Sequence, residues 1–149
     1  MKTFLLVLLF LVCTPSVYSQ GWLPREVDFT LGRIEQAFRS GHPSSIEDLL
    51  VSGMTMRLGD SLYESISSIT ALNALEEFFA DKDSIDFQFG LPGSGMMIYS
   101  SAGKRDTTAV DVWLRRVPGG VGLYALNISN YPIATVFFNI PREKKESTK

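Results

Sequence analysis

One histidine in 149 residues limits the acid–base and metal chemistry that this sequence can support. Any Ser-His-Asp triad or histidine-rich metal site would have to be built around His42. His42 stands between Gly41 and Pro43, in a predicted turn between two helices, where a solvated side chain is the expected state of a histidine. We therefore predict no metal site and no histidine-based catalytic residue.

Carboxylates occur in close pairs along the chain, and paired acids could perform general acid–base catalysis. Neighbouring residues on a helix point in different directions, however, and these acids lie opposite the predicted apolar stripes. We expect them on solvated faces: Glu47 and Asp48, Glu76 and Glu77, and Asp81 and Asp83. The segment 81–83 also lacks the length and the terminal Glu of a calcium loop. Asp111 alternates with predicted buried residues and should point away from the core.

Two short motifs carry weak signals. The run GLPGSG at residues 90–95 follows a predicted strand, but another strand comes next rather than a helix. It therefore fits neither a P-loop nor a dinucleotide fingerprint, and we expect a flexible loop between strands. Asn127-Ile128-Ser129 matches the glycosylation sequon but lies within a predicted strand, so we interpret the match as chance. No cofactor is predicted from these motifs.

The N-terminal residues predict export. Lys2 precedes an apolar run at residues 4–12, and Val17-Tyr18-Ser19 follows, the pattern of a signal peptide (residues 1–19) that is cleaved near Ser19. The alternative interpretation of this run is a buried N-terminal helix. Because the apolar run is too short to span a bilayer comfortably, we expect no stable membrane insertion. Lipidation of Cys13 is disfavoured because Val12, not a small residue, precedes it. The mature protein, periplasmic or secreted, would then have no cysteine and no disulfide.

Composition indicates a folded domain: hydrophobic residues make up 45% of the chain and charged residues 20%. The net charge is −2, and the Lys and Arg residues are scattered, which argues against a nucleic-acid partner. The length suits one domain whose core can be large enough to stand without disulfides.

Apolar spacing predicts three helices interleaved with strands. A helix begins at Arg25 and ends at Gly41, and the capping-box spacing of SSIE at residues 44–47 predicts a second, short helix. Residues 54–58 alternate as a strand. Residues 61–66 fit either its return strand or the first turns of a longer helix, and the strand is preferred because Ser67-Ser68 is typical of a helix cap. A third helix at residues 69–79 and strands at residues 85–91 and 96–101 follow.

Residues 107–130 predict two strands joined by a tight hairpin at Pro118-Gly119-Gly120. A three-residue loop pairs Val117 with Val121, Leu114 with Tyr124, Val112 with Leu126, and Val110 with Ile128. A two-residue loop would instead pair Leu114 with Ala125 and Val112 with Asn127. We favour the three-residue loop because it gives one continuous apolar face.

Trp113 is expected on the opposite face of this hairpin, across from Ala125. Burial of a large indole at that position would be favourable, so we expect another segment to cover it. That segment is either residues 133–140, folding back as an added edge strand, or a second copy of the chain. We predict a homodimer through the sheet face, with its contact centred on Trp113 and Ala125. Residues 141–149 form a charged, solvated tail.

The order of helices and strands predicts an α+β domain with its helices on one face of a mostly antiparallel sheet. Over residues 25–130 the chain resembles a family of small exported bacterial proteins of unknown function with the nuclear transport factor 2-like fold. The resemblance is carried by Ala37-Phe38 with Ser40-Gly41, Leu49-Leu50, Tyr63-Glu64-Ser65 and Phe78-Phe79. It implies three N-terminal helices packed on a strongly curved sheet, as a cone within residues 25–140. It transfers no catalytic residues, and the sequence departs from the family pattern after Tyr131.

Enzymes of this superfamily place an acid or base inside the cone, whereas the inward strand positions here are apolar or tyrosine. Phe87, Phe89, Tyr124 and either Met97 with Tyr99 or Met96 with Ile98 should line the concave side. Core packing is the simpler interpretation, and the functional one is an apolar ligand cavity walled by Phe89, Tyr99 and Tyr124. We therefore predict an exported, non-enzymatic domain that binds a small apolar ligand or a protein. The alternative is an isomerase- or dehydratase-type enzyme that uses a pocket tyrosine in the cone cavity.

Overall fold

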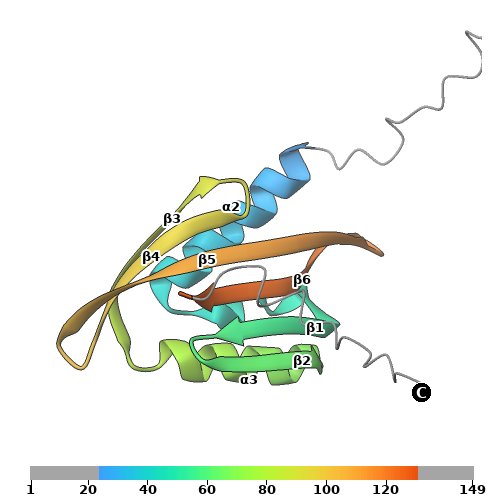
Figure 1. Cartoon of the computed structure of the whole chain (residues 1–149). Coiled ribbons are helices and arrows are strands. Elements are labelled where there is room, and N and C mark those ends of the chain that lie inside the picture. Colours follow the sequence, from blue (N-terminus) through green and yellow to red (C-terminus); the bar gives the residue numbers. More distant parts are fainter. Residues whose placement is uncertain (1–23, 131–149) are drawn as a thin grey trace, which may run out of the picture.

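Helices cover one side of a six-stranded sheet in the computed structural model, which describes residues 24–130 (Figure 1). The predicted signal peptide, the segment 133–140 and the charged tail lie outside the described residues. Within residues 24–130, no helix is long and apolar enough to cross a membrane.

The first helix, α2 (Pro24–Ser40), covers the predicted range and buries the expected stripe, with Ile34 and Phe38 fully inaccessible. It is followed by η1 (Pro43–Leu49), a 3-10 helix rather than the α-helix with a capping box that SSIE predicts. The cap residue is His42, whose side chain makes no capping hydrogen bond. Pro43 explains the difference, because its fixed φ suits the first helical position and starts the turn before Ser44.

The next helix, α3 (Ser68–Phe79), begins at the predicted cap, where the Ser67 side chain accepts a hydrogen bond from the backbone N–H of Thr70. This cap settles the open alternative for residues 61–66, which form a strand. The described residues thus contain two α-helices and one 3-10 helix, with α3 placed after the first strand pair.

The strands are β1 (Leu50–Leu58), β2 (Ser61–Ile66), β3 (Lys82–Leu91), β4 (Ser94–Ser101), β5 (Lys104–Val117) and β6 (Gly120–Ser129). Their order across the sheet is β2-β1-β6-β5-β4-β3. Only the β1–β6 pair is parallel among these strands, so the sheet is mostly antiparallel and the α+β class is confirmed. β1 and β6, far apart in sequence, therefore lie side by side in the sheet (Figure 1).

The β5–β6 hairpin corrects the predicted register at its tip. Val117 pairs with Gly120, so the loop has two residues, Pro118 and Gly119, and not three. Further along, Val110 pairs with Ile128 and Val112 with Leu126, as predicted. A bulge reconciles the two ends, because Trp113 pairs with Ala125 whereas Leu114 pairs with Leu123, which leaves Tyr124 as the extra residue. The turn is one residue shorter than predicted, and the bulge restores the predicted pairing and its apolar face in the rest of the hairpin.

The core fills the space between the helices and the sheet. Phe38, Phe79, Phe87 and Leu126 are buried in it, while Leu72 is partly exposed at its margin. On β4 the inward pair is Met97 and Tyr99, because Met97 is fully buried and Met96 is exposed. The sheet face turned toward the helices is called the inner face below, and the opposite one the outer face.

Candidate functional site

Aromatic rings occupy the interior where a cone cavity was expected. The ring centroid of Phe38 lies 5.2 Å from that of Phe79 and 5.8 Å from that of Phe87. Phe89 continues this stack, with its ring edge-on to Phe87 at 4.8 Å. These side chains pack against one another at distances typical of aromatic pairs in cores. Phe89 therefore packs at the edge of this buried aromatic cluster.

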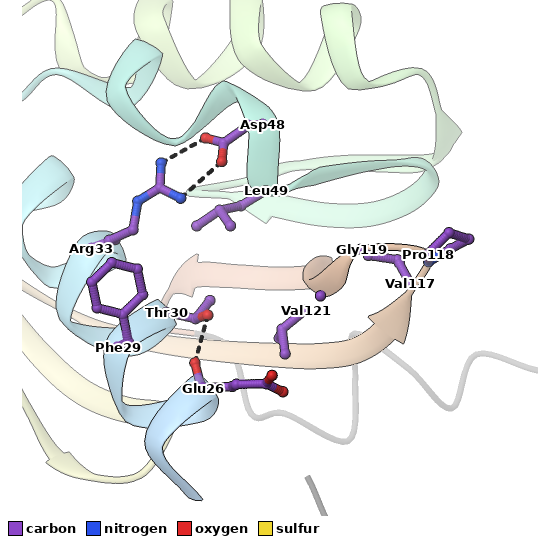
Figure 2. Close-up of a pocket in the computed structure, with 11 residues that line it drawn as sticks. Glu26, Phe29, Thr30, Arg33, Asp48, Leu49, Val117, Pro118, Gly119 and Val121 are labelled. Carbon is purple, nitrogen blue, oxygen red and sulfur yellow. Dashed lines mark hydrogen bonds and ion pairs between the residues drawn. The ribbon is translucent and has the colours of Figure 1, made fainter. Parts of the chain in front are cut away.

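One hollow of about 300 Å³ lies between α2, η1 and the tip of the β5–β6 hairpin (Figure 2). We call it the mouth hollow. Its lining comes from α2 (Glu26, Phe29, Thr30 and Arg33), from η1 (Asp48 and Leu49) and from residues 117–121. Three separate segments thus meet here because the short hairpin loop brings Pro118 and Gly119 opposite the first turns of α2.

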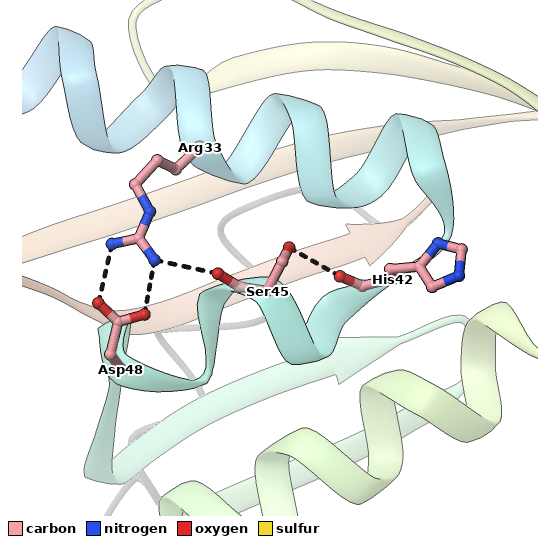
Figure 3. A network of polar contacts seen from close by, with 4 residues as sticks. All are labelled: Arg33, His42, Ser45 and Asp48. Atoms are coloured by element: carbon pink, nitrogen blue, oxygen red, sulfur yellow. Dashed lines mark hydrogen bonds and ion pairs between the residues drawn. The ribbon is translucent and has the colours of Figure 1, made fainter.

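A bidentate ion pair forms one wall of the mouth hollow (Figures 2 and 3). Arg33 donates from Nη1 to Asp48 Oδ2 at 2.8 Å and from Nη2 to Asp48 Oδ1 at 2.6 Å. Nη2 also donates to the backbone carbonyl of Ser45 at 3.0 Å. These hydrogen bonds, more than the opposite charge, lower the pKa of Asp48 and raise that of Arg33. The fork geometry fixes η1 against α2 and holds both charges in one orientation.

Phe29 gives the mouth hollow its apolar side. Its ring lies 70% exposed, although α2 buries most of its other large apolar side chains. Thr30 is buried behind it, with its hydroxyl donating to the carbonyl of Glu26 at 2.8 Å. An exposed aromatic ring next to a fixed ion pair combines an apolar anchor with a polar rim, which is the composition of protein-binding surfaces.

A second, apolar groove of about 200 Å³ lies where α2 meets β5 and the turn between β3 and β4. It is lined by Val27, Leu31, Pro92, Gly93, Val112, Trp113 and Leu114. Trp113 is half-buried and pairs with Ala125 across the hairpin, as predicted. The GLPGSG run contributes a tight turn here, since the Gly93 carbonyl accepts a hydrogen bond from the Val112 N–H at 2.8 Å. The sequence predicted a flexible loop here, whereas the structure shows a tight turn that this backbone hydrogen bond joins to β5.

Tyr99 borders a third hollow, of about 170 Å³, at the other end of the sheet. Burial raises its pKa, and the negative charges of Asp106 and Asp81 add to the effect. Lys82 lies close by, with Nζ 3.8 Å from the Phe78 ring centroid and 5.2 Å from that of Tyr99. Lys82 Nζ donates to Asp81 at 2.9 Å, and this bond lowers the pKa of Asp81. The hydroxyl of Tyr99 is therefore held in its protonated form.

The three residues proposed as one cavity wall are thus placed apart. Phe89 packs in the aromatic stack, and the hollow that Tyr99 borders includes neither Phe89 nor Tyr124. Tyr124 is 36% exposed, with the Arg115 guanidinium 5.9 Å from its ring centroid. The predicted pairing of Leu114 with Tyr124 is wrong, because the bulge gives that place to Leu123.

The remaining candidates mostly take the structural roles expected of them. His42 is exposed in the turn after α2 (Figure 3), and its Nδ1 lies 2.6 Å from the carbonyl of Ser40. Asn127 of the sequon is fully buried. Among residues 24–130, no group of three or more His, Cys, Asp or Glu side chains is arranged to hold a metal ion.

Sequence reasoning missed the mouth hollow. Asp48 was correctly expected to be exposed, but its pairing with Arg33, fifteen positions away, was not foreseen. The available signal was Phe29, which falls outside the stripe of Val27, Leu31, Ile34 and Phe38 and so had to face away from the core.

Comparison with known proteins supports the fold and not a specific function. No family model and no curated protein matches the sequence. Among solved structures, a DUF4783 family protein from Bacteroides uniformis is similar, with a TM-score of 0.53 and 17% identity over 68% of this chain and 96% of that one. A proposed dehydratase of the NTF2-like family from Streptomyces avermitilis gives a TM-score of 0.52 and 13% identity over 72% and 95%. The chain therefore has the nuclear transport factor 2-like fold.

Proposed function

We propose that this chain is an exported, non-enzymatic binding domain that engages a protein partner at the mouth hollow. The observation that carries the proposal is the filled interior: the rings of Phe38, Phe79 and Phe87 are buried and pack against one another between the helices and the sheet. Binding is then left to the surface, where Phe29 is exposed beside the Arg33–Asp48 pair.

The chemistry of the mouth hollow favours a polypeptide over a small apolar ligand. The Phe29 ring can contact an apolar side chain of a partner, while Glu26 and the Arg33–Asp48 pair offer charged groups around it. Such rings are frequent anchors of protein interfaces because they bury a large area at a small cost in side-chain entropy. A small apolar ligand, the other expected partner, would fit better in the groove lined by Val27, Leu31 and Val112.

The proposal is tested by Phe29→Ser with Ile69→Ser as the matched control, since Ile69 is equally exposed on α3, at 68%. Each variant, tagged and exported in the native host, is cross-linked and its partners are identified by mass spectrometry. We expect a partner that cross-links to wild type and to Ile69→Ser but not to Phe29→Ser. Calorimetry with the purified domains should then show that this partner binds wild type and Ile69→Ser with similar affinity and Phe29→Ser more weakly. A partner set that is unchanged by Phe29→Ser would contradict the proposal.

The enzyme alternative has one observation in its favour, the placement of Tyr99 beside Asp106. With its pKa raised by burial, the Tyr99 hydroxyl could donate a proton but would be a poor base at neutral pH. Native mass spectrometry of the protein purified from its host would identify a retained small molecule. Loss of that molecule in Tyr99→Phe, with binding at the mouth hollow unchanged, would favour the enzyme.

A further inference from the structure

A row of polar side chains crosses the outer face of the sheet. Direct strand pairing places Arg57 of β1 next to Asn127 of β6, Asn127 next to Asp111 of β5, and Asp111 next to Ser94 of β4. We call these four residues the outer row. Asn127 donates from Nδ2 to Asp111 Oδ2 at 3.2 Å, and the Ser94 hydroxyl donates to Asp111 Oδ1. The carboxylate is therefore satisfied by two neutral donors within the face.

Three of the four residues of the outer row are shielded from solvent although the row lies away from the helices, and Ser94 is half-buried. Asn127 is 0% exposed, Asp111 6% and Arg57 8%, and Ala125 in the adjacent row is 1% exposed. α2 and α3 both lie on the other side of the sheet (Figure 1), and their buried residues cluster with inner-face residues such as Val110 and Leu126. Among residues 24–130, no helix covers the outer row.

We propose that residues 133–140 of the same chain dock over the outer row and Trp113. The chain leaves β6 at Ser129, beside the strands that carry the row, so only a short connection is needed. Eight extended residues reach about 26–29 Å, and the three strand spacings from β4 to β1 amount to about 14 Å. The segment is long enough to cross the whole row.

The composition of the segment fits this surface. IATVFFNI at residues 133–140 has no charged residue, whereas REKKESTK, which follows Pro141, is mostly charged and suited to water. An apolar cover over Asp111 is tolerable because Ser94 and Asn127 already hydrogen-bond its carboxylate. Phe137 and Phe138 offer rings that can pack on the half-buried Trp113. This cover occupies the face through which the homodimer was predicted, so the two arrangements exclude each other.

Contact quenching by tryptophan tests the proposal on the whole chain. In a Cys13→Ser background, a bimane label is attached at Thr135→Cys or, as the control, at Thr148→Cys in the charged tail. We expect strong quenching at position 135 that is lost when Trp113→Phe is added, and no effect of Trp113→Phe at position 148. Equal brightness at position 135 with and without Trp113 would overturn the proposal.

Dilution separates the cover from the dimer. Quenching at position 135 that persists on dilution supports docking within one chain, whereas quenching that disappears on dilution would overturn it in favour of a second copy. Analytical ultracentrifugation of the unlabelled chain provides the matching measurement of mass.

A second measurement keeps the proposal testable if Trp113→Phe fails to fold. In a Trp22→Phe background, Phe137→Ser with Phe138→Ser should shift the Trp113 emission to longer wavelength. Lys144→Ser with Lys145→Ser should leave it unchanged. An emission that neither pair of changes affects would also overturn the proposal.

Discussion

The two faces of the sheet are both buried at their centre, but by different chemistry. On the inner face, Phe87, Val110 and Leu126 contact the apolar stripes of α2 and α3, and burial comes from hydrocarbon contact. On the outer face, Asp111 and Asn127 are also buried, and a hydrogen bond from the Asn127 amide to the Asp111 carboxylate joins them. The inner face therefore derives its stability from packing, whereas the outer face depends on hydrogen bonds to its buried carboxylate.

The largest effect is expected from removing an inner-face aromatic contact. Phe79→Ala should lower the free energy of unfolding by about 3–5 kcal/mol, because a ring that is 3% exposed and stacked on Phe38 leaves a cavity. Denaturant unfolding followed by circular dichroism measures the loss. Phe29→Ala, at a ring that is 70% exposed, is the control and should stay within about 0.5 kcal/mol. Similar losses for the two variants would mean that the interior is not packed as described.

A close backbone approach on the inner face predicts the next effect. A methyl group at Gly95 would meet the Gln88 carbonyl and come within 3.0 Å of the Phe87 ring, across the β3–β4 pair. Gly95→Ala should therefore cost about 1–3 kcal/mol, the usual penalty for overpacking. Gly90→Ala is the matched control in the same hairpin, because nothing lies within 4 Å of its added methyl. A Gly95→Ala domain as stable as wild type would show that the two strands can separate freely.

The outer face is probed by removing its carboxylate. Asp111→Ala leaves the Asn127 amide and the Ser94 hydroxyl without their shared acceptor in a buried row, which should cost about 1–3 kcal/mol in unfolding free energy. Asp86→Ala removes an exposed acid on the edge strand β3 and should change stability little. Equal, small effects of the two changes would indicate that water reaches the outer row and would weaken the contrast between the faces.

The smallest expected effect concerns the mouth hollow, outside both faces. The lowered pKa of Asp48 means that the folded state holds its proton less tightly than the unfolded state, whose pKa is near 3.8. The stabilisation is present above that value and is lost as pH falls through the lower folded pKa. Because the pair is partly exposed, it should amount to about 0.2–1 kcal/mol. Asp48→Asn should flatten this part of the pH–stability curve, and an unchanged curve would contradict the pairing.

Much of the fold was predictable from local pattern. The α2 stripe, the Ser67 cap and the alternation of β3 each depend on residues a few positions apart. The structure confirms the first two, and it confirms the alternation as far as Phe89, whereas Leu91 at the end of β3 is 71% exposed. The inner face followed from the same alternation, because one buried side of a strand shows directly in its sequence. For the same reason Phe29, out of phase on α2, could have been identified as exposed.

Only the tertiary structure decided the features that join distant segments. Arg33 and Asp48 lie on separate helices, and their pairing depends on how η1 packs against α2. The turn of two residues and the bulge at Tyr124 preserve the same apolar face as a turn of three, so the pattern alone could not choose between them. Predicting the outer row would have required the pairing registers of all four strands that contribute to it. Periodicity specifies which side of an element is buried, whereas the pairing of elements is set by the whole packed chain.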